Sequence, residues 1–65
     1  MNNLSLNVNV MKANAMLGMV EANTTVDRSL LLEDEGFCKL LTVCAHKDTI
    51  DFGAVLLTDY VNENY

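Results

Sequence analysis

The sequence predicts a small α+β domain, and three features of the chain support this prediction. Apolar and polar residues alternate strictly over residues 4–10, which is the pattern of a half-buried strand. Helical spacing of apolar residues follows over residues 12–22. An acidic segment that ends in glycine, residues 33–36, then separates two further apolar stretches. We therefore expect a strand, a helix, a β-hairpin and a C-terminal helix or strand, in that order.

The predicted first strand covers residues 4–10, with the sequence Leu-Ser-Leu-Asn-Val-Asn-Val. Its four aliphatic residues are Leu4, Leu6, Val8 and Val10. Successive side chains of a strand point to opposite faces, so these four residues would share one face. A single strand leaves both its amide edge and its apolar face without partners. We expect that another part of the chain, or another molecule, covers them.

The next segment, residues 12–22, has the spacing of a helix with one apolar face. The apolar residues at positions i, i+3, i+4 and i+7 are Ala13, Met16, Leu17 and Val20. Alanine and methionine are good helix formers, whereas Gly18 weakens the helix by about 1 kcal/mol relative to alanine. The alternative is a bulged continuation of the strand, because apolar residues also alternate between Met11 and Met19.

The predicted hairpin pairs residues 27–32 with residues 37–45 across the acidic segment 33–36. In this interpretation Gly36 takes the left-handed conformation of a short loop, and the three carboxylates lie in solvent at its tip. The same segment also fits a helix C-terminus, with Phe37 packing back on the last turn. Three carboxylates near the negative end of a helix cost about 0.3–1 kcal/mol each, and this favours the hairpin.

The last predicted element, residues 50–61, is a helix or a strand. The apolar residues at positions i, i+4, i+7 and i+11 are Ile50, Ala54, Leu57 and Val61. This spacing indicates a helix, and Asp48 or Thr49 can serve as its N-cap. Gly53 and several β-branched residues argue partly against a helix, so a strand remains the alternative. The polar residues 62–65 are expected to fray.

The composition predicts one compact domain over residues 1–65. Hydrophobic residues make up 51% of the chain, and there is no proline, which argues against a disordered segment. A chain of this length buries only roughly 60% of the surface that it exposes when unfolded. We therefore expect surplus apolar side chains to lie in an interface. The alternative fold is a compact all-α bundle with a flexible or paired N-terminal segment.

The charge balance argues against nucleic acids and anionic membranes as partners. The chain has four basic and nine acidic residues, a net charge of −5. Nucleic-acid backbones and anionic lipids attract clustered lysines and arginines, and the basic residues here are spread along the chain. No apolar run approaches the roughly 20 residues of a membrane-spanning helix. The N-terminus also lacks the pattern of a secretory signal, so we expect a cytoplasmic protein.

The nearest approach to a chemical site is the set Cys38, Cys44 and His46. The spacing C-x5-C-x-H differs from the ligand spacings of structural zinc sites, which need four ligands. On a strand, Cys44 and His46 would share a face, but a nucleophile also needs an oriented third group and an oxyanion hole. We expect two thiols that behave as small hydrophobes and a solvent-facing imidazole, with no metal, cofactor or catalytic residue.

The sequence thus predicts a small acidic protein that is not an enzyme and binds another protein. It would act as a homodimer or as an inhibitor or accessory protein of a larger target, of the kind that phages encode. Edge pairing or apolar packing would hold the complex, and the acidic tip would steer towards a basic surface. The predicted interface residues are Leu4, Leu6, Val8, Val10, Met16, Met19, Glu33, Asp34 and Glu35. The alternatives are a metal- or thiol-dependent module using Cys38, Cys44 and His46, and a peptide substrate of a maturation enzyme.

Overall fold

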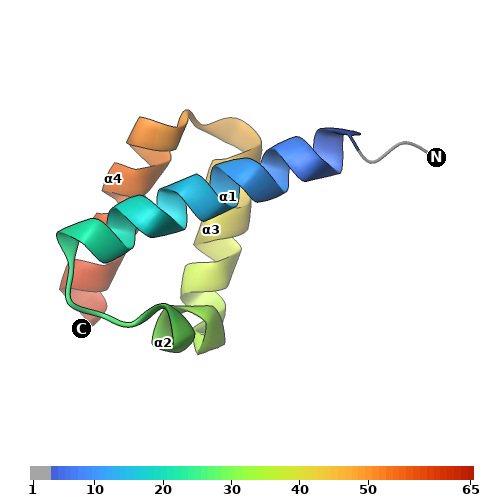
Figure 1. The fold of residues 1–65 in the computed structure, drawn as a ribbon. Helices are drawn as coiled ribbons and strands as arrows, with labels where there is room; N and C mark the ends of the chain where they lie inside the picture. Colours follow the sequence, from blue (N-terminus) through green and yellow to red (C-terminus); the bar gives the residue numbers. More distant parts are fainter. Residues whose placement is uncertain (1–3) are drawn as a thin grey trace.

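The computed structural model describes the backbone of residues 4–65 and the side chains of residues 9–65. The described residues form four helices and no strand: α1 (Leu4–Asn23), α2 (Arg28–Glu33), α3 (Glu35–Lys47) and α4 (Ile50–Asn64). α3 and α4 run antiparallel, and α1 lies across both of them (Figure 1). The preferred α+β fold is therefore wrong, and the all-α bundle describes the chain.

The predicted strand over residues 4–10 is the first part of α1, which continues without a break to Asn23. A strand needs a partner for its backbone amides, and residues 9–65 supply no second strand. A helix satisfies its amides internally, and propagating it from the helical segment 12–22 avoids the cost of a new nucleus. The helix predicted over residues 12–22 is confirmed. Seven alternating residues are too short a signal to outweigh this neighbouring helix.

The predicted hairpin is also wrong, because residues 27–32 and 37–45 lie in α2 and α3. The acidic segment starts α3: Asp34 is its N-cap, and the side chain of Asp34 accepts a hydrogen bond from the Phe37 amide. Glu35 lies in the first turn, where the positive end of the helix dipole favours a carboxylate. In residues 4–65 no glycine has a positive φ, so Gly36 is an ordinary helical residue.

The helical alternative for residues 50–61 is confirmed by α4. The Thr49 hydroxyl caps this helix by accepting a hydrogen bond from the Phe52 amide at 3.2 Å. The helix continues to Asn64, and the Tyr65 amide donates to the Val61 carbonyl oxygen at 2.9 Å. Residues 62–64 therefore form the last turn of α4. Among residues 4–65, no helix combines the length and the apolar composition that crossing a bilayer requires.

One apolar core joins all four helices. Its buried members come from every helix and are Met16, Leu17, Val20, Leu31, Phe37, Leu41, Cys44, Leu57 and Val61. The Phe37 and Tyr60 rings pack with centroids 6.0 Å apart and planes tilted by 59°. Gly53 lies where α4 approaches Met16 of α1 and Cys44 of α3. The absence of a side chain at this position allows the three helices to meet closely.

Candidate functional site

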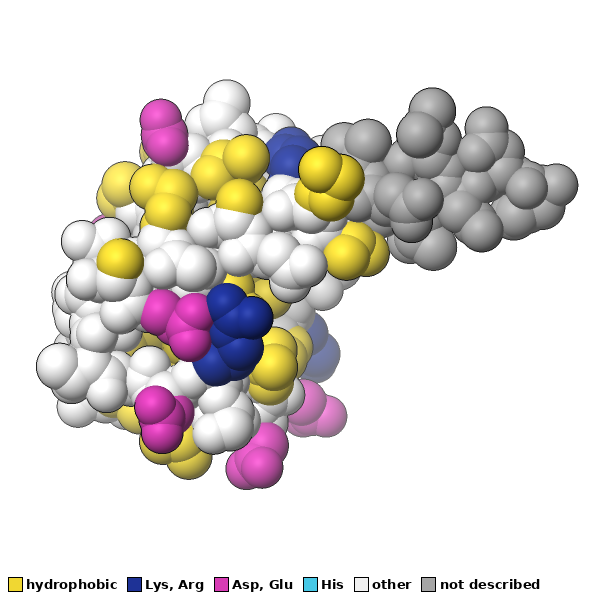
Figure 2. Space-filling view, viewed as in Figure 1, with side chains coloured by type: hydrophobic (Ala, Val, Ile, Leu, Met, Phe, Trp, Pro, Cys, Tyr) yellow, Lys and Arg dark blue, Asp and Glu magenta, His cyan; other side chains and the backbone are white. Residues whose placement is uncertain are grey.

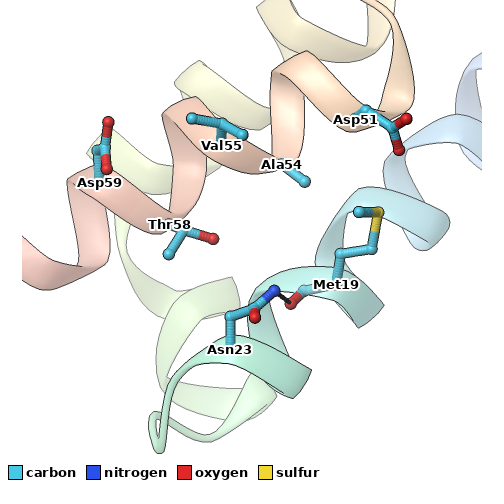
Figure 3. Close-up of a pocket in the computed structure, with 7 residues that line it drawn as sticks. All are labelled: Met19, Asn23, Asp51, Ala54, Val55, Thr58 and Asp59. Atoms are coloured by element: carbon cyan, nitrogen blue, oxygen red, sulfur yellow. Dashed lines mark hydrogen bonds between the residues drawn. The ribbon is translucent and has the colours of Figure 1, made fainter.

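A groove between α1 and α4 is the best candidate for a functional site. It has a volume of about 380 Å³ and opens to solvent. Its lining residues are Met19, Asn23, Asp51, Ala54, Val55, Thr58 and Asp59. Met19 and Asn23 belong to α1, and the other lining residues belong to α4. In Figure 3, Ala54 and Thr58 point towards α1, whereas Val55 and Asp59 lie at the outer edge of α4. We refer to this feature as the α1/α4 groove.

The two helices position these side chains through ordinary helical periodicity. On α1, Met19 and Asn23 are one turn apart, and the Asn23 amide donates to the Met19 carbonyl oxygen at 2.7 Å (Figure 3). On α4, Ala54 is buried against the core, whereas the neighbouring Val55 is 57% exposed. The α1/α4 groove thus has an apolar floor and an exposed apolar side chain at its edge. Burial of such apolar surface by a partner is favourable, because it removes the surface from water.

The electrostatics of the α1/α4 groove are one-sided. Asp51 and Asp59 are two of its lining residues, and no basic side chain lines it. Among the described residues the one ion pair joins Arg28 to Glu21 at 2.7 Å, so neither groove aspartate has a charged partner there. The acidic character of the groove matches the net charge of −5.

Hydrophobic side chains are also exposed elsewhere along α1. Figure 2 shows exposed hydrophobic side chains over the first half of α4 and near the N-terminal end of the described part of α1. Val10 and Met11 belong to this exposed set. A smaller groove of about 220 Å³ lies between α1 and α3. A hydrogen bond of 3.0 Å between Asn9 Nδ2 and His46 Nδ1 links the two helices across it.

The structure does not bring the residues of the predicted apolar interface together on one surface. Leu4, Leu6 and Val8 lie in the helical backbone of α1, and their side chains are outside the described residues. Edge pairing is not available to them, because a helix has no free strand edge. Met16 has no exposed surface and belongs to the core, whereas Met19 lines the α1/α4 groove.

The predicted acidic tip is divided in the same way. Glu33 and Glu35 are exposed, whereas Asp34 is half-buried and accepts hydrogen bonds from other parts of the fold. Asp34 Oδ1 accepts hydrogen bonds from the Phe37 amide and the Tyr60 hydroxyl, both at 3.0 Å. Asp34 Oδ2 accepts one from the Tyr65 hydroxyl at 2.7 Å. We call Asp34, Tyr60 and Tyr65 the Asp34 cluster.

The hydrogen bonds of the Asp34 cluster shift the pKa values of its members. The Phe37 amide and then the Tyr65 hydroxyl lower the pKa of the Asp34 carboxyl, because both stabilise its charged form. The bond to this carboxylate raises the pKa of Tyr60 and raises the pKa of Tyr65 to about 12. A Cβ at Gly36 would lie 2.5 Å from the Tyr60 hydroxyl oxygen, so only glycine leaves room for this arrangement.

The two cysteines and the histidine do not form one site. In α3, Cys44 is buried in the core, and the Cys38 thiol donates to the Leu32 carbonyl oxygen at 3.3 Å. His46 is exposed and bonds to Asn9 of α1. Residues two apart in a helix lie on nearly opposite sides, so the expected shared face of Cys44 and His46 is wrong. Within the described residues no three histidine, cysteine or acidic side chains are grouped to hold a metal ion.

Of the residues that line the α1/α4 groove, only Met19 was predicted to lie in an interface, although the sequence of α4 carries one further signal. The apolar stripe that predicted α4 accounts for its buried face. Val55 lies outside this stripe, between Asp51 and Asp59 on the polar side of the helix. An apolar residue in that position is surplus to the core and marks a surface for contact. The α1 side of the groove could not be assigned until the packing of α1 against α4 was known.

Comparison of the chain with protein-family models, with curated proteins and with solved structures gave no significant match.

Proposed function

We propose that this chain is a binding protein, not an enzyme, and that it contacts another protein through the α1/α4 groove. The exposure of Val55 beside an apolar floor is the observation that carries this proposal. Apolar surface of this kind is costly in water, and burial by a partner turns that cost into binding free energy.

The arrangement of groups in the α1/α4 groove supports a protein as the partner. Protein interfaces combine an apolar centre with a polar rim. Here Met19, Ala54 and Val55 supply the centre, while Asp51 and Asp59 supply part of the rim. Methionine adapts its shape to different partners, which suits a contact surface.

In this proposal the protein acts as an accessory or inhibitor subunit of a larger target. The outer sides of α1 and α4 would make the apolar contact, in place of the strand predicted from the sequence. Affinity then comes from the apolar centre, and the rim carboxylates act mainly on orientation and association rate.

Replacing Val55 with lysine tests the proposal directly. We expect Val55→Lys to weaken capture of the partner from the source cells by about tenfold or more, because it places a charge in the apolar centre. The measurement is quantitative mass spectrometry of the material retained on immobilised protein.

Val43→Lys is the matched control, because Val43 is 49% exposed on α3 and does not line the α1/α4 groove. Circular dichroism confirms that both variants keep their helices. If Val55→Lys retains the same partner as strongly as Val43→Lys, the groove is not the binding site.

A further inference from the structure

We infer that the α1/α4 groove receives a cationic amphipathic helix of the partner, with one basic side chain on each side of an apolar contact. This inference rests on the proposed function and adds the chemistry of the partner to it. It follows from the order of side chains along α4, from the composition of the facing wall, and from the charge of the chain.

The first step is the spacing along α4. Asp51, Val55 and Asp59 are four residues apart, so they follow one ridge of the helix in the order acid, valine, acid. At 1.5 Å per residue, the two carboxylates are separated by roughly 12 Å along the helix axis. A partner helix that packs on this ridge would meet both aspartates with basic residues seven or eight positions apart. Its apolar residues would fall midway, opposite Val55.

The second step is the opposite wall of the groove. Met19 of α1 faces Ala54 of α4 across the apolar floor, and both line the groove (Figure 3). An aliphatic side chain inserted beside Val55 would therefore contact carbon or sulfur on both sides. Asn23 and Thr58 supply polar groups at one end, which limits the apolar contact to about one helical turn of the partner.

The third step separates this partner from a second copy of the same chain. Two copies that joined symmetrically at this groove would bring Asp51 and Asp59 close to the same carboxylates of the other copy. Like charges brought together in an interface are strongly unfavourable. Each copy also carries a net charge of −5, and no basic residue lines the groove to compensate. A basic segment of a different protein would instead complement the charges of Asp51 and Asp59.

The probe for this inference is an alanine-based helical peptide of about 18 residues. It carries two leucines on one face and one lysine on each side of them, spaced to match the aspartates. A second peptide has glutamine in place of both lysines. Binding is followed by heteronuclear NMR titration of the full chain. We expect the lysine peptide to shift the signals of Met19, Ala54 and Val55, and the glutamine peptide to bind about fivefold more weakly.

The variants keep side-chain shape and remove charge. Asp51→Asn combined with Asp59→Asn is expected to weaken binding of the lysine peptide by about fivefold. Glu33→Gln combined with Glu35→Gln removes the same charge from exposed carboxylates outside the groove, and we expect less than about twofold change in the affinity for the lysine peptide. Equal losses in both double variants would overturn the inference, because net charge alone would then explain the binding.

Other results separate the inference from the proposed function. If the glutamine peptide binds the groove as tightly as the lysine peptide, the groove is a binding site but the basic partner is wrong. The same conclusion follows if neither peptide binds while Val55→Lys still loses the natural partner. Shifts confined to residues outside the groove would contradict both proposals. A dimer in sedimentation that Val55→Lys dissociates would replace the basic partner with a second copy.

Discussion

Replacing Gly53 with alanine is expected to lower the free energy of unfolding by about 1–3 kcal/mol, although alanine is the better helix former. A Cβ at this position would lie 2.6 Å from the Met16 methyl carbon, 2.8 Å from its sulfur and 3.1 Å from Cys44 Cβ. Met16 is fully buried, so moving the end of its side chain requires repacking of the core, and Cys44 must also give way by a few tenths of an ångström. Urea denaturation followed by circular dichroism measures the cost.

Gly18 provides the matched control in the same fold. A Cβ there would meet no atom within 4 Å, so Gly18→Ala should raise the stability by about 0.5–1 kcal/mol through helix propensity alone. The two glycine-to-alanine substitutions are therefore expected to change the free energy of unfolding in opposite directions. A stabilised Gly53→Ala variant would mean that α1, α3 and α4 do not meet as closely as described.

Replacing Asp34 with asparagine is expected to lower the pKa values of both tyrosines in the folded protein, because it removes the carboxylate that raises them. The chain has two tyrosines and no tryptophan, and both tyrosines donate to Asp34. We expect Tyr65 to ionise with a pKa of about 12 in the parent protein. In Asp34→Asn both tyrosines should titrate near the ordinary value of about 10. Ultraviolet absorbance of tyrosinate reports both ionisations.

The same shifts determine how stability depends on pH. The pKa of the Asp34 carboxyl is lowered on folding, so its contribution is present above about pH 4 and is lost as the pH falls through the folded value. The pKa of Tyr65 is raised on folding, so its contribution is complete below about pH 10 and is lost as the pH rises towards 12. The cluster thus stabilises the fold between these limits.

Two controls make the titration specific. Asp27→Asn removes the same charge from a residue whose side chain makes no capping hydrogen bond, and it should leave both tyrosine pKa values unchanged. Tyr60→Phe leaves Tyr65 as the sole chromophore and assigns the higher ionisation. Circular dichroism at each pH verifies that the helices persist. Two tyrosines that titrate together near pH 10 in the folded parent protein would contradict the Asp34 cluster.

The sequence predicted helices for two of the apolar stripes that lie in the core, those of α1 and α4, whereas the core stripe of α3 was predicted as a hairpin strand. Met16, Leu17 and Val20 pack in the core from α1, and Leu57 and Val61 pack there from α4. These stripes repeat over several turns, so local periodicity is enough to identify them. The alternation over residues 4–10 is as regular but shorter, and it has no described strand to pair with. Regular spacing alone therefore did not decide between strand and helix.

The acidic segment shows a different kind of error. Asp34 followed by Glu35 is the start signal of a helix, comparable to the capping residue Thr49 that was recognised before α4. The prediction placed these carboxylates at a hairpin tip, because three of them at the end of a preceding helix would be unfavourable. In the structure Glu33 is the last residue of α2, whereas Asp34 and Glu35 begin α3. Gly36 supported the error, because a glycine after acidic residues is typical of turns.

The long-range contacts could not be predicted from the sequence. Asp34 bonds to Tyr60 and Tyr65, which lie 26 and 31 positions away. Only the antiparallel arrangement of α3 and α4 brings these groups together. The α1/α4 groove has the same origin, because its two walls are separated along the chain by α2 and α3.

Methyl NMR of the protein bound to its captured partner tests the α1/α4 groove most directly. We expect the methyl signals of Met19 and Val55 to shift on binding, and those of Val43 on α3 to stay in place. Unchanged Met19 and Val55 signals in a complex that shifts Val43 would contradict the assignment of the groove as the binding surface.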